Sequence, residues 1–110
     1  LICACGECDL GKIFPDTDNQ WKGISSLVLL EKTGEIVRQQ GYQIVNTDTT
    51  IVAQQPKLAS YIKAMNIAIA KTLKIDPGQV NVKATTTERL GFVGREEGIA
   101  AYAVVLLQNK

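Results

Sequence analysis

Apolar residues recur along the chain with two different periods, one typical of helices and the other of strands. Leu27, Leu30 and Val37 return at helical spacing. Ser25 or Ser26 precedes them as a favoured N-cap, one glycine near the middle weakens the helix, and another glycine follows where helices commonly end. A first helix is therefore predicted between this serine cap and the second glycine.

A second apolar stripe predicts another helix, from about Ser60 to Lys74. The stripe has intervals of four, three, four and four residues and consists of Leu58, Ile62, Met65, Ile69 and Leu73. Met65 lies within this stripe, so we interpret it as core packing and not as a ligand. The turn formers Asp76-Pro77-Gly78 come after the helix.

Three segments have the residue content of strands. Tyr42–Gln54 is rich in β-branched residues and stops before a proline, and Gln79–Thr85 alternates apolar with polar residues. Ile99–Leu107 is nearly all apolar, which predicts a central strand or one buried on both faces. The order of elements predicts an α+β fold, with a single layer of helices packed on one face of a mixed or antiparallel β-sheet.

Length and composition are those of one ordinary globular domain, residues 1–110. Apolar residues make up 45% and charged residues 21% of the chain. The net charge is +1 without a run of like charge, so neither nucleic acid nor a membrane surface is an expected partner. We expect no membrane span and no signal peptide. Since the chain opens without methionine in an apolar stretch, we expect a truncated or processed product whose missing strands would complete the sheet.

Histidine is absent, which excludes His-based acid–base catalysis and His-ligated metal within this sequence. Three cysteines, Cys3, Cys5 and Cys8, lie within the first eight residues. Without a fourth ligand their spacing makes a poor structural zinc site, and free thiols at a frayed terminus are the simpler interpretation.

Two segments offer groups that bind anions or cations, although each also has a purely structural interpretation. Asp9–Asp18 holds three aspartates that suit substrate hydroxyls or a divalent cation, but aspartates also cap backbone amides in solvated turns. Ala53–Ala59 lies where a strand passes into a helix, so its free N–H groups and Lys57 suit an anion. The alternative for this second segment is a plain connection with an exposed lysine.

Two further segments add hydroxyl, carboxylate and guanidinium groups. Ala84–Glu88 offers three threonine hydroxyls to phosphate oxygens and a carboxylate to Mg²⁺, but Thr85-x-x-Glu88 also matches a helix capping box. Gly91–Gly98 turns tightly and carries Arg95 as a phosphate ligand, or is a flexible connector. Taken together, the four segments predict a phosphate-rich site with a cation that works by positioning and charge neutralisation, as phosphoryl transfer allows.

The same segments resemble the signatures of a known family. The matching stretches are Asp9-Leu10-Gly11, Phe14-Pro15-Asp16-Thr17-Asp18, Gly41-Tyr42, Asn46-Thr47-Asp48, Ala53-Gln54-Gln55-Pro56-Lys57, Asn81 to Glu88, Leu90-Gly91-Phe92, Gly94-Arg95 and Glu97 to Ala100. From Asp9 to the C-terminus their order and spacing are similar to those of the 2-C-methyl-D-erythritol 2,4-cyclodiphosphate synthase family of the non-mevalonate isoprenoid pathway.

The resemblance implies a phosphorus–oxygen lyase that cyclises 4-diphosphocytidyl-2-C-methyl-D-erythritol 2-phosphate and releases CMP, in the bacterial cytoplasm or the plastid stroma. The substrate-binding residues that it implies are Asp9, Leu10, Gly11, Phe14, Pro15, Asp16, Thr17, Asp18, Ala53, Gln54, Gln55, Pro56, Lys57, Leu58, Ala59, Ala84, Thr85, Thr87, Glu88, Phe92 and Arg95. Thr86 would be the catalytic residue that stabilises the transition state, and Glu88 would hold Mg²⁺ or Mn²⁺. The family is a homotrimer with active sites between neighbouring subunits.

The sequence departs from the family at several positions. The family's zinc ligands, an Asp-x-His pair and a further His, are absent, and so is a His-Ser pair beside the substrate. Cys8 replaces a glycine, and Tyr102 stands where many relatives carry a glutamate near the trimer axis. Two hypotheses follow: an enzyme, or an inactive remnant that binds nucleotide or forms trimers. In either case we expect the last strand to be the trimer interface, with Arg95 and Glu97 paired across subunits.

Overall fold

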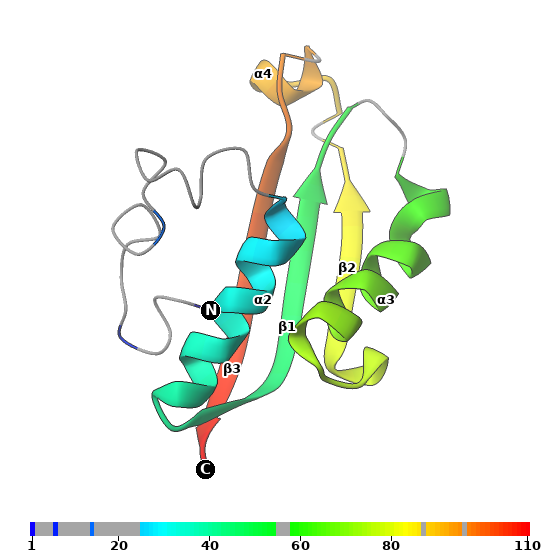
Figure 1. The fold of residues 1–110 in the computed structure, drawn as a ribbon. Coiled ribbons are helices and arrows are strands. Elements are labelled where there is room, and N and C mark those ends of the chain that lie inside the picture. The colour runs from blue at the N-terminus through cyan, green and yellow to red at the C-terminus, as the bar shows by residue number, and fades with distance from the viewer. Residues whose placement is uncertain (2–5, 7–13, 15–24, 55–57, 87, 96) are drawn as a thin grey trace.

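Three strands form one mixed sheet in the computed structural model, which describes residues 1, 6, 14, 25–54, 58–86, 88–95 and 97–110. The strands are β1 (Tyr42–Val52), β2 (Val80–Thr85) and β3 (Ala100–Asn109). Their order is β2-β1-β3, with β1 parallel to β2 and antiparallel to β3 (Figure 1). Consequently the carboxyl ends of β1 and β2 lie at the same edge of the sheet.

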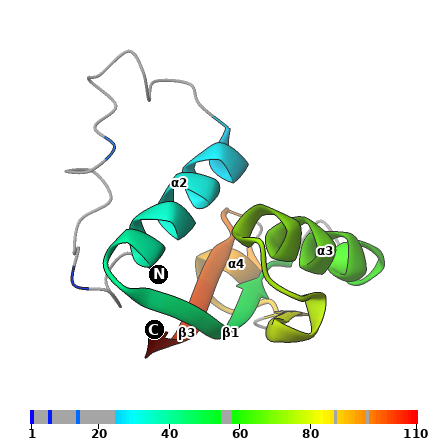
Figure 2. The same cartoon turned by 60° about the horizontal axis from the view of Figure 1, so that its bottom comes forward.

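Two helices, α2 (Ser26–Gln39) and α3 (Ile62–Leu73), cover one face of this sheet (Figures 1 and 2). Shorter helical turns are η2 (Ala59–Tyr61), η3 (Pro77–Gln79) and α4 (Gly91–Gly94). The predicted α+β fold, with helices in one layer on a mixed sheet, is therefore confirmed. The boundaries differ slightly, since β1 ends two residues before Gln54 and β3 runs two residues beyond Leu107. No helix among the described residues is long and apolar enough to cross a bilayer.

The core lies between the helices and the sheet. One buried cluster consists of Val37, Ile44 and Leu73, and the other of Ala70, Val80 and Val82. Met65 packs against the second cluster, as its stripe predicted. Burying such side chains at about 25 cal/mol per Å² of apolar surface is the main force that holds the helices on the sheet.

Gly34 within α2 and Gly41 just after it have different roles. Gly41 has a φ of 89°, the left-handed conformation expected of a residue that ends a helix. Gly34 is buried, and a Cβ added there would lie 3.3 Å from Cδ2 of Leu73. The weakening of the helix by Gly34 stays a prediction, and its missing side chain lets α2 approach α3 closely.

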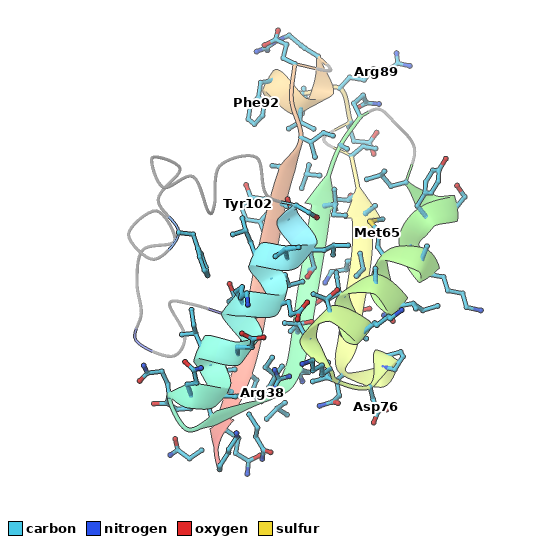
Figure 3. The ribbon with its side chains drawn as sticks, in the orientation of Figure 1. Arg38, Met65, Asp76, Arg89, Phe92 and Tyr102 are labelled. Carbon is cyan, nitrogen blue, oxygen red and sulfur yellow. The ribbon has the colours of Figure 1, made fainter. Side chains whose placement is uncertain are left out.

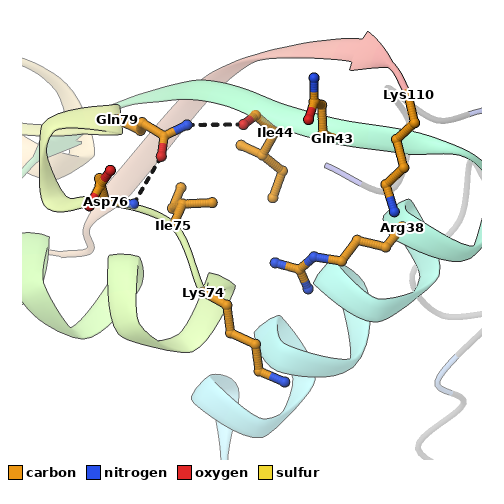
Figure 4. Close-up of a pocket in the computed structure, with 8 residues that line it drawn as sticks. All are labelled: Arg38, Gln43, Ile44, Lys74, Ile75, Asp76, Gln79 and Lys110. Carbon is orange, nitrogen blue, oxygen red and sulfur yellow. Dashed lines mark hydrogen bonds between the residues drawn. The ribbon is translucent and has the colours of Figure 1, made fainter.

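A β-bulge interrupts the pairing of β1 with β3. The register shifts between Ile44 and Asn46, so Val45 is the extra residue. Nε2 of Gln79 donates to the carbonyl oxygens of Ile44 at 3.1 Å and Val45 at 3.0 Å (Figure 4 shows the bond to Ile44). Oε1 of the same amide accepts from the backbone N–H of Asp76 at 2.9 Å. Gln79 therefore fixes the bulge to the turn that precedes β2.

The prediction that the last strand is central or buried on both faces is wrong for the described chain. β3 lies at the end of the strand order and pairs with β1 alone among the described strands. Tyr102, Val104 and Leu106 are 66%, 72% and 55% exposed, whereas Val105 and Leu107, which alternate with them, are half-buried on the helix side. Apolar composition predicts that the faces of a strand are buried, but it does not predict which element packs against them.

Candidate functional site

The candidate site lies where β1 and β2 end side by side. In the last rung of the parallel pair Val52 is opposite Thr85, and the N–H of Ala53 donates to the carbonyl of Thr85 at 3.0 Å. Two of the predicted segments, Ala53–Ala59 and Ala84–Glu88, are far apart in the sequence and meet at this edge. The parallel pairing is therefore what assembles the site.

A cavity of about 230 Å³ lies between these segments and is lined by Ala53, Gln54, Leu58, Ala59, Ala84, Thr85 and Thr86. All seven are among the predicted site residues. Gln55, Pro56 and Lys57, which belong to the same prediction, lie outside the described residues. Because small-molecule pockets are commonly about 300–1,000 Å³, this cavity would hold one part of a larger ligand. Its alanine and leucine side chains suit a flat ring, and its threonines suit phosphate oxygens.

A turn that follows β2 carries Glu88 and is hydrogen-bonded to two residues that line the cavity. Oγ1 of Thr86 accepts from the N–H of Glu88 at 3.3 Å, and Oε1 of Gln54 accepts from the N–H of Arg89 at 3.2 Å. Glu88 and Arg89 have φ values of 53° and 65°. Left-handed backbone cannot form the first turn of a helix, so the capping-box interpretation of Thr85-x-x-Glu88 is wrong. Thr87, a predicted site residue, lies outside the described residues.

The carboxylate of Glu88 is available to a cation. Its side chain is exposed, and the structure gives it no ion pair with another described residue. Carboxylate oxygens are the ligands that Mg²⁺ prefers. No group of three or more His, Cys, Asp or Glu that could hold a metal by itself occurs among the described residues, and the three cysteines lie outside them.

The glycine-rich segment forms a separate feature next to the site. Phe92 of α4 is 52% exposed and lines a second cavity, of about 170 Å³, together with Val52, Leu90, Gly91, Val93, Ala100 and Tyr102. This cavity shares no lining residue with the first one. Arg95 pairs with Glu97 of the same chain, Nε to Oε1 at 2.8 Å. The pairing of these residues across subunits stays a prediction. Within the described chain, Phe92 and Arg95 therefore do not join Thr86.

Gly94 shows that the glycine-rich segment is more than a flexible connector. A Cβ at Gly94 would lie 2.1 Å from the carbonyl carbon of Arg89. Backbone atoms cannot yield as the end of a side chain can, so only glycine allows α4 to pack on this turn. The close approach of Gly94 to Arg89 was not predictable from the sequence, because nothing local marks the residue that this glycine meets.

Of the predicted segment Asp9–Asp18, the structure describes Phe14, whose side chain is 8% exposed and belongs to the buried apolar residues. The other predicted site residues of that segment lie outside the described part, namely Asp9, Leu10, Gly11, Pro15, Asp16, Thr17 and Asp18. Their roles stay predictions.

A polar cluster lies on the face of the sheet opposite the helices. Oδ1 of Asp48 accepts from Nζ of Lys83 at 2.6 Å and from Nδ2 of Asn81 at 3.0 Å. The hydrogen bond from Lys83 and then that from Asn81 lower the pKa of the Asp48 carboxyl. These residues belong to the family-like motifs, and the structure uses them to join β1 to β2. The pair was not predictable from the sequence, because it depends on the register between β1 and β2.

A larger cavity, of about 570 Å³, lies at the other end of the sheet (Figure 4). Arg38 and Asp76, which line it, are far from Arg89 and Phe92 in Figure 3. Nη2 of Arg38 donates to the carbonyl of Leu73 at the end of α3, and the amide of Gln79 holds the bulge. These polar groups already serve the fold, so volume alone does not make this cavity the functional site.

The sequence profile of the YgbB family matches residues 1–108. The motif resemblance began at Asp9, whereas this match also includes the residues before Asp9. A 2-C-methyl-D-erythritol 2,4-cyclodiphosphate synthase of Geobacillus sp. (strain WCH70) is 58% identical over 107 residues, which cover 97% of this chain and 68% of that protein. A second synthase, from Syntrophobacter fumaroxidans, is 58% identical over 92% of this chain and 64% of its own length. The chain thus spans about two thirds of these curated relatives.

Solved structures of similar fold agree with this result. The bifunctional IspDF from Campylobacter jejuni has a TM-score of 0.93 and 43% identity, over 99% of this chain and 30% of that chain. The CDP complex of IspF from Plasmodium falciparum has a TM-score of 0.86 and 31% identity, over 99% of this chain and 65% of that chain.

Proposed function

The chain belongs to the YgbB family, and from this we propose that it cyclises 4-diphosphocytidyl-2-C-methyl-D-erythritol 2-phosphate to 2-C-methyl-D-erythritol 2,4-cyclodiphosphate and releases CMP. It would act as a phosphorus–oxygen lyase of the non-mevalonate pathway, through one domain that includes residues 1–110. The observation that carries this proposal is the single cavity that joins the Ala53 and Leu58 side of the site to Thr85 and Thr86. The CDP in the Plasmodium relative supports a cytidine nucleotide as the ligand.

The proposed reaction needs positioning more than it needs a protein base. An oxygen of the 2-phosphate attacks the β-phosphorus of the diphosphate, and the new P–O bond closes the ring. The bond from the β-phosphorus to the oxygen shared with the α-phosphorus breaks, and CMP leaves with that oxygen and the electron pair. Since both reacting phosphates belong to one substrate, holding them in line supplies much of the rate enhancement.

Thr86 would stabilise the transition state through its hydroxyl group. A hydroxyl has one donor and two acceptor sites, and the N–H of Glu88 occupies one acceptor site of Thr86. The Thr86 proton is therefore left to donate to a phosphate oxygen. Ala53, Leu58 and Ala59 would frame the cytidine, with Gln55, Pro56 and Lys57 completing that side.

Glu88 would hold a divalent cation, Mg²⁺ or Mn²⁺. The cation would neutralise negative charge on the diphosphate when bound. An exposed carboxylate without an ion pair among the described residues fits a hard cation that takes its remaining ligands from phosphate and water. The Asp-x-His pair and the further His that hold zinc in the family are not in this sequence. No step is therefore assigned to zinc.

The protein would work as a homotrimer, with CMP and the diphosphocytidyl substrate as its small-molecule partners. Tyr102, Val104 and Leu106 form an apolar stripe on the helix-free face of β3, which water would otherwise meet. Phe92 and Thr86 line different cavities within one chain, which supports sites shared between subunits. In such a site, Phe92 of one copy would contact the substrate held at Thr86 of its neighbour. A bacterial cytoplasm or a plastid stroma is the proposed location.

Turnover tests this proposal on protein expressed from its complete coding sequence. With substrate and Mg²⁺, ³¹P NMR should show the cyclic diphosphate and CMP appearing in equal amounts. Thr86→Val should lower kcat by about 100-fold, the usual effect of removing one transition-state donor, and Thr86→Ser should restore most of it. Binding of CMP without conversion of substrate would instead support the inactive-remnant hypothesis.

A further inference from the structure

We infer that Gln54 is a positioning residue that ties the nucleotide cavity to the turn carrying Glu88, and thereby fixes where the cation binds. The inference rests on the proposed function, in which Glu88 holds the cation. Its basis is one side chain that takes part in both features. Gln54 lines the cavity at the ends of the strands, and its Oε1 accepts from the N–H of Arg89 at 3.2 Å.

The turn needs such a support because its backbone is strained. Glu88 and Arg89 are consecutive residues in the left-handed region, where side chains with a Cβ are disfavoured. Such conformations persist only when the surroundings hold them in place. Both side chains are exposed, so core packing does not supply the restraint. The described hydrogen bonds to this turn run from Glu88 to Thr86 and from Arg89 to Gln54.

A second contact restrains the turn from the side of α4. Gly94 lies so close that a Cβ there would be 2.1 Å from the carbonyl carbon and 2.5 Å from Cα of Arg89. The N–H of Gly94 in turn donates to the carbonyl of Leu90 at 3.1 Å. The backbone of Arg89 is therefore held between the amide of Gln54 and the surface of α4. Losing the amide would release one side of this clamp.

The consequence for the site is a link between two loops that come from different strands. Gln54 follows β1, which carries the nucleotide side, and Glu88 follows β2, which carries the cation side. Backbone pairing between the strands reaches only as far as Ala53 and Thr85. Beyond that rung the Gln54–Arg89 bond is the next hydrogen bond between the two loops among the described residues.

The test compares two variants of Gln54 in protein expressed from its complete coding sequence. Gln54→Met keeps the length of the side chain and removes the amide oxygen, whereas Gln54→Glu keeps an acceptor for Arg89. Gln39→Met, at the exposed end of α2, is the control for the substitution itself. The Mg²⁺ concentration for half-maximal rate should rise about tenfold in Gln54→Met, the factor expected for one lost hydrogen bond. The Kd for CMP without Mg²⁺ should rise by less than this factor, because the other six residues that line the cavity are unchanged.

A second measurement is independent of turnover. Hydrogen exchange at the Arg89 amide should become about tenfold faster in Gln54→Met, and stay near the unchanged rate in Gln54→Glu and in Gln39→Met. Equal losses of CMP and Mg²⁺ affinity, or unchanged exchange at Arg89, would overturn the inference. If the unchanged protein has no turnover, the proposed function fails, and the exchange measurement alone decides whether Gln54 positions the turn.

Discussion

The side-chain amide of Gln79 donates to the carbonyl oxygen of Val45 at 3.0 Å, and this bond holds the bulge of β1 in place. Successive residues of a strand face opposite sides of a sheet, so one extra residue changes the facing of all that follow. The bulge therefore determines that Thr47 points under the helices and that Asp48 lies on the open face. The same alternation continues to Ala53 at the site.

Gln79→Ala should lower the free energy of unfolding by about 1–3 kcal/mol, because it leaves the carbonyls of Ile44 and Val45 without their partner. Urea unfolding measures this change. Gln43→Ala is the control, because Gln43 is exposed and lines the same cavity of about 570 Å³ as Gln79. Its free energy of unfolding should stay within about 0.5 kcal/mol of that of the unchanged protein. If both variants lose the same stability, Gln79 does not hold the bulge.

Thr47→Val should stabilise the protein by up to about 1 kcal/mol. The hydroxyl of Thr47 is buried and has no hydrogen-bond partner among the described residues, so a methyl group of similar shape removes a desolvation cost. Thr33→Val is the matched change, since Thr33 is equally buried but its hydroxyl donates to the carbonyl of Leu29 at 2.8 Å. Thermal unfolding should shift in opposite directions for the two variants. A loss of stability in Thr47→Val would mean that its hydroxyl is bonded in solution.

Gly94→Ala should lower kcat by about 100-fold, because the added Cβ must push the backbone of Arg89 away by more than about 1 Å. Gly78→Ala is the control, since a Cβ there meets nothing within 4 Å. Steady-state kinetics and far-UV circular dichroism separate this local effect from unfolding. Full activity in Gly94→Ala would show that the turn adapts and is not clamped.

The carboxyl of Asp48 should titrate below the ordinary aspartate value, and Lys83→Met should raise its pKa. A depressed pKa in the folded state means that the interaction stabilises the protein above the unfolded-state pKa. That contribution is lost as the pH falls through the folded-state pKa. NMR titration of the carboxyl carbon gives both values, and an unchanged pKa in Lys83→Met would refute the assignment.

Val104→Asp should dissociate the proposed trimer, because Val104 lies on the exposed stripe of β3 and a charge buried there is costly. Lys71→Asp, on the exposed side of α3, is the control and should leave the assembly intact. Light scattering after size exclusion reports the mass of each variant. A stable monomer of the unchanged protein, or a Val104→Asp variant that remains trimeric, would contradict the proposed interface.

The features that the sequence predicted well depend on local periodicity. The stripes ending at Val37 and Leu73 placed both helices, and the β-branched run before Ala53 placed β1. The features that it missed depend on register and close approach. The Asp48–Lys83 pair requires the parallel alignment of β1 and β2, and the clamp on Arg89 requires α4 to fold back on the turn.

The candidate site was predictable to the extent that motif residues lie at strand ends. Two segments that follow β1 and β2 had to meet once these strands paired in parallel, and Thr86 joins Ala53 in one cavity for that reason. The separation of Phe92 from Thr86 was not predictable, because it depends on how α4 packs on the turn after β2 and no local pattern records that packing. The place of β3 at the end of the strand order depends on strand pairing, which its apolar composition does not specify.

Diffraction from crystals soaked with CDP and Mn²⁺ shows where the nucleotide and the cation bind, because the anomalous signal of manganese identifies the position of the cation. We predict manganese bound to the carboxylate of Glu88 and to the diphosphate, with the cytosine in the cavity lined by Ala53 and Leu58. Nucleotide ordered instead in the cavity lined by Arg38 and Lys74, or manganese bound away from Glu88, would contradict it.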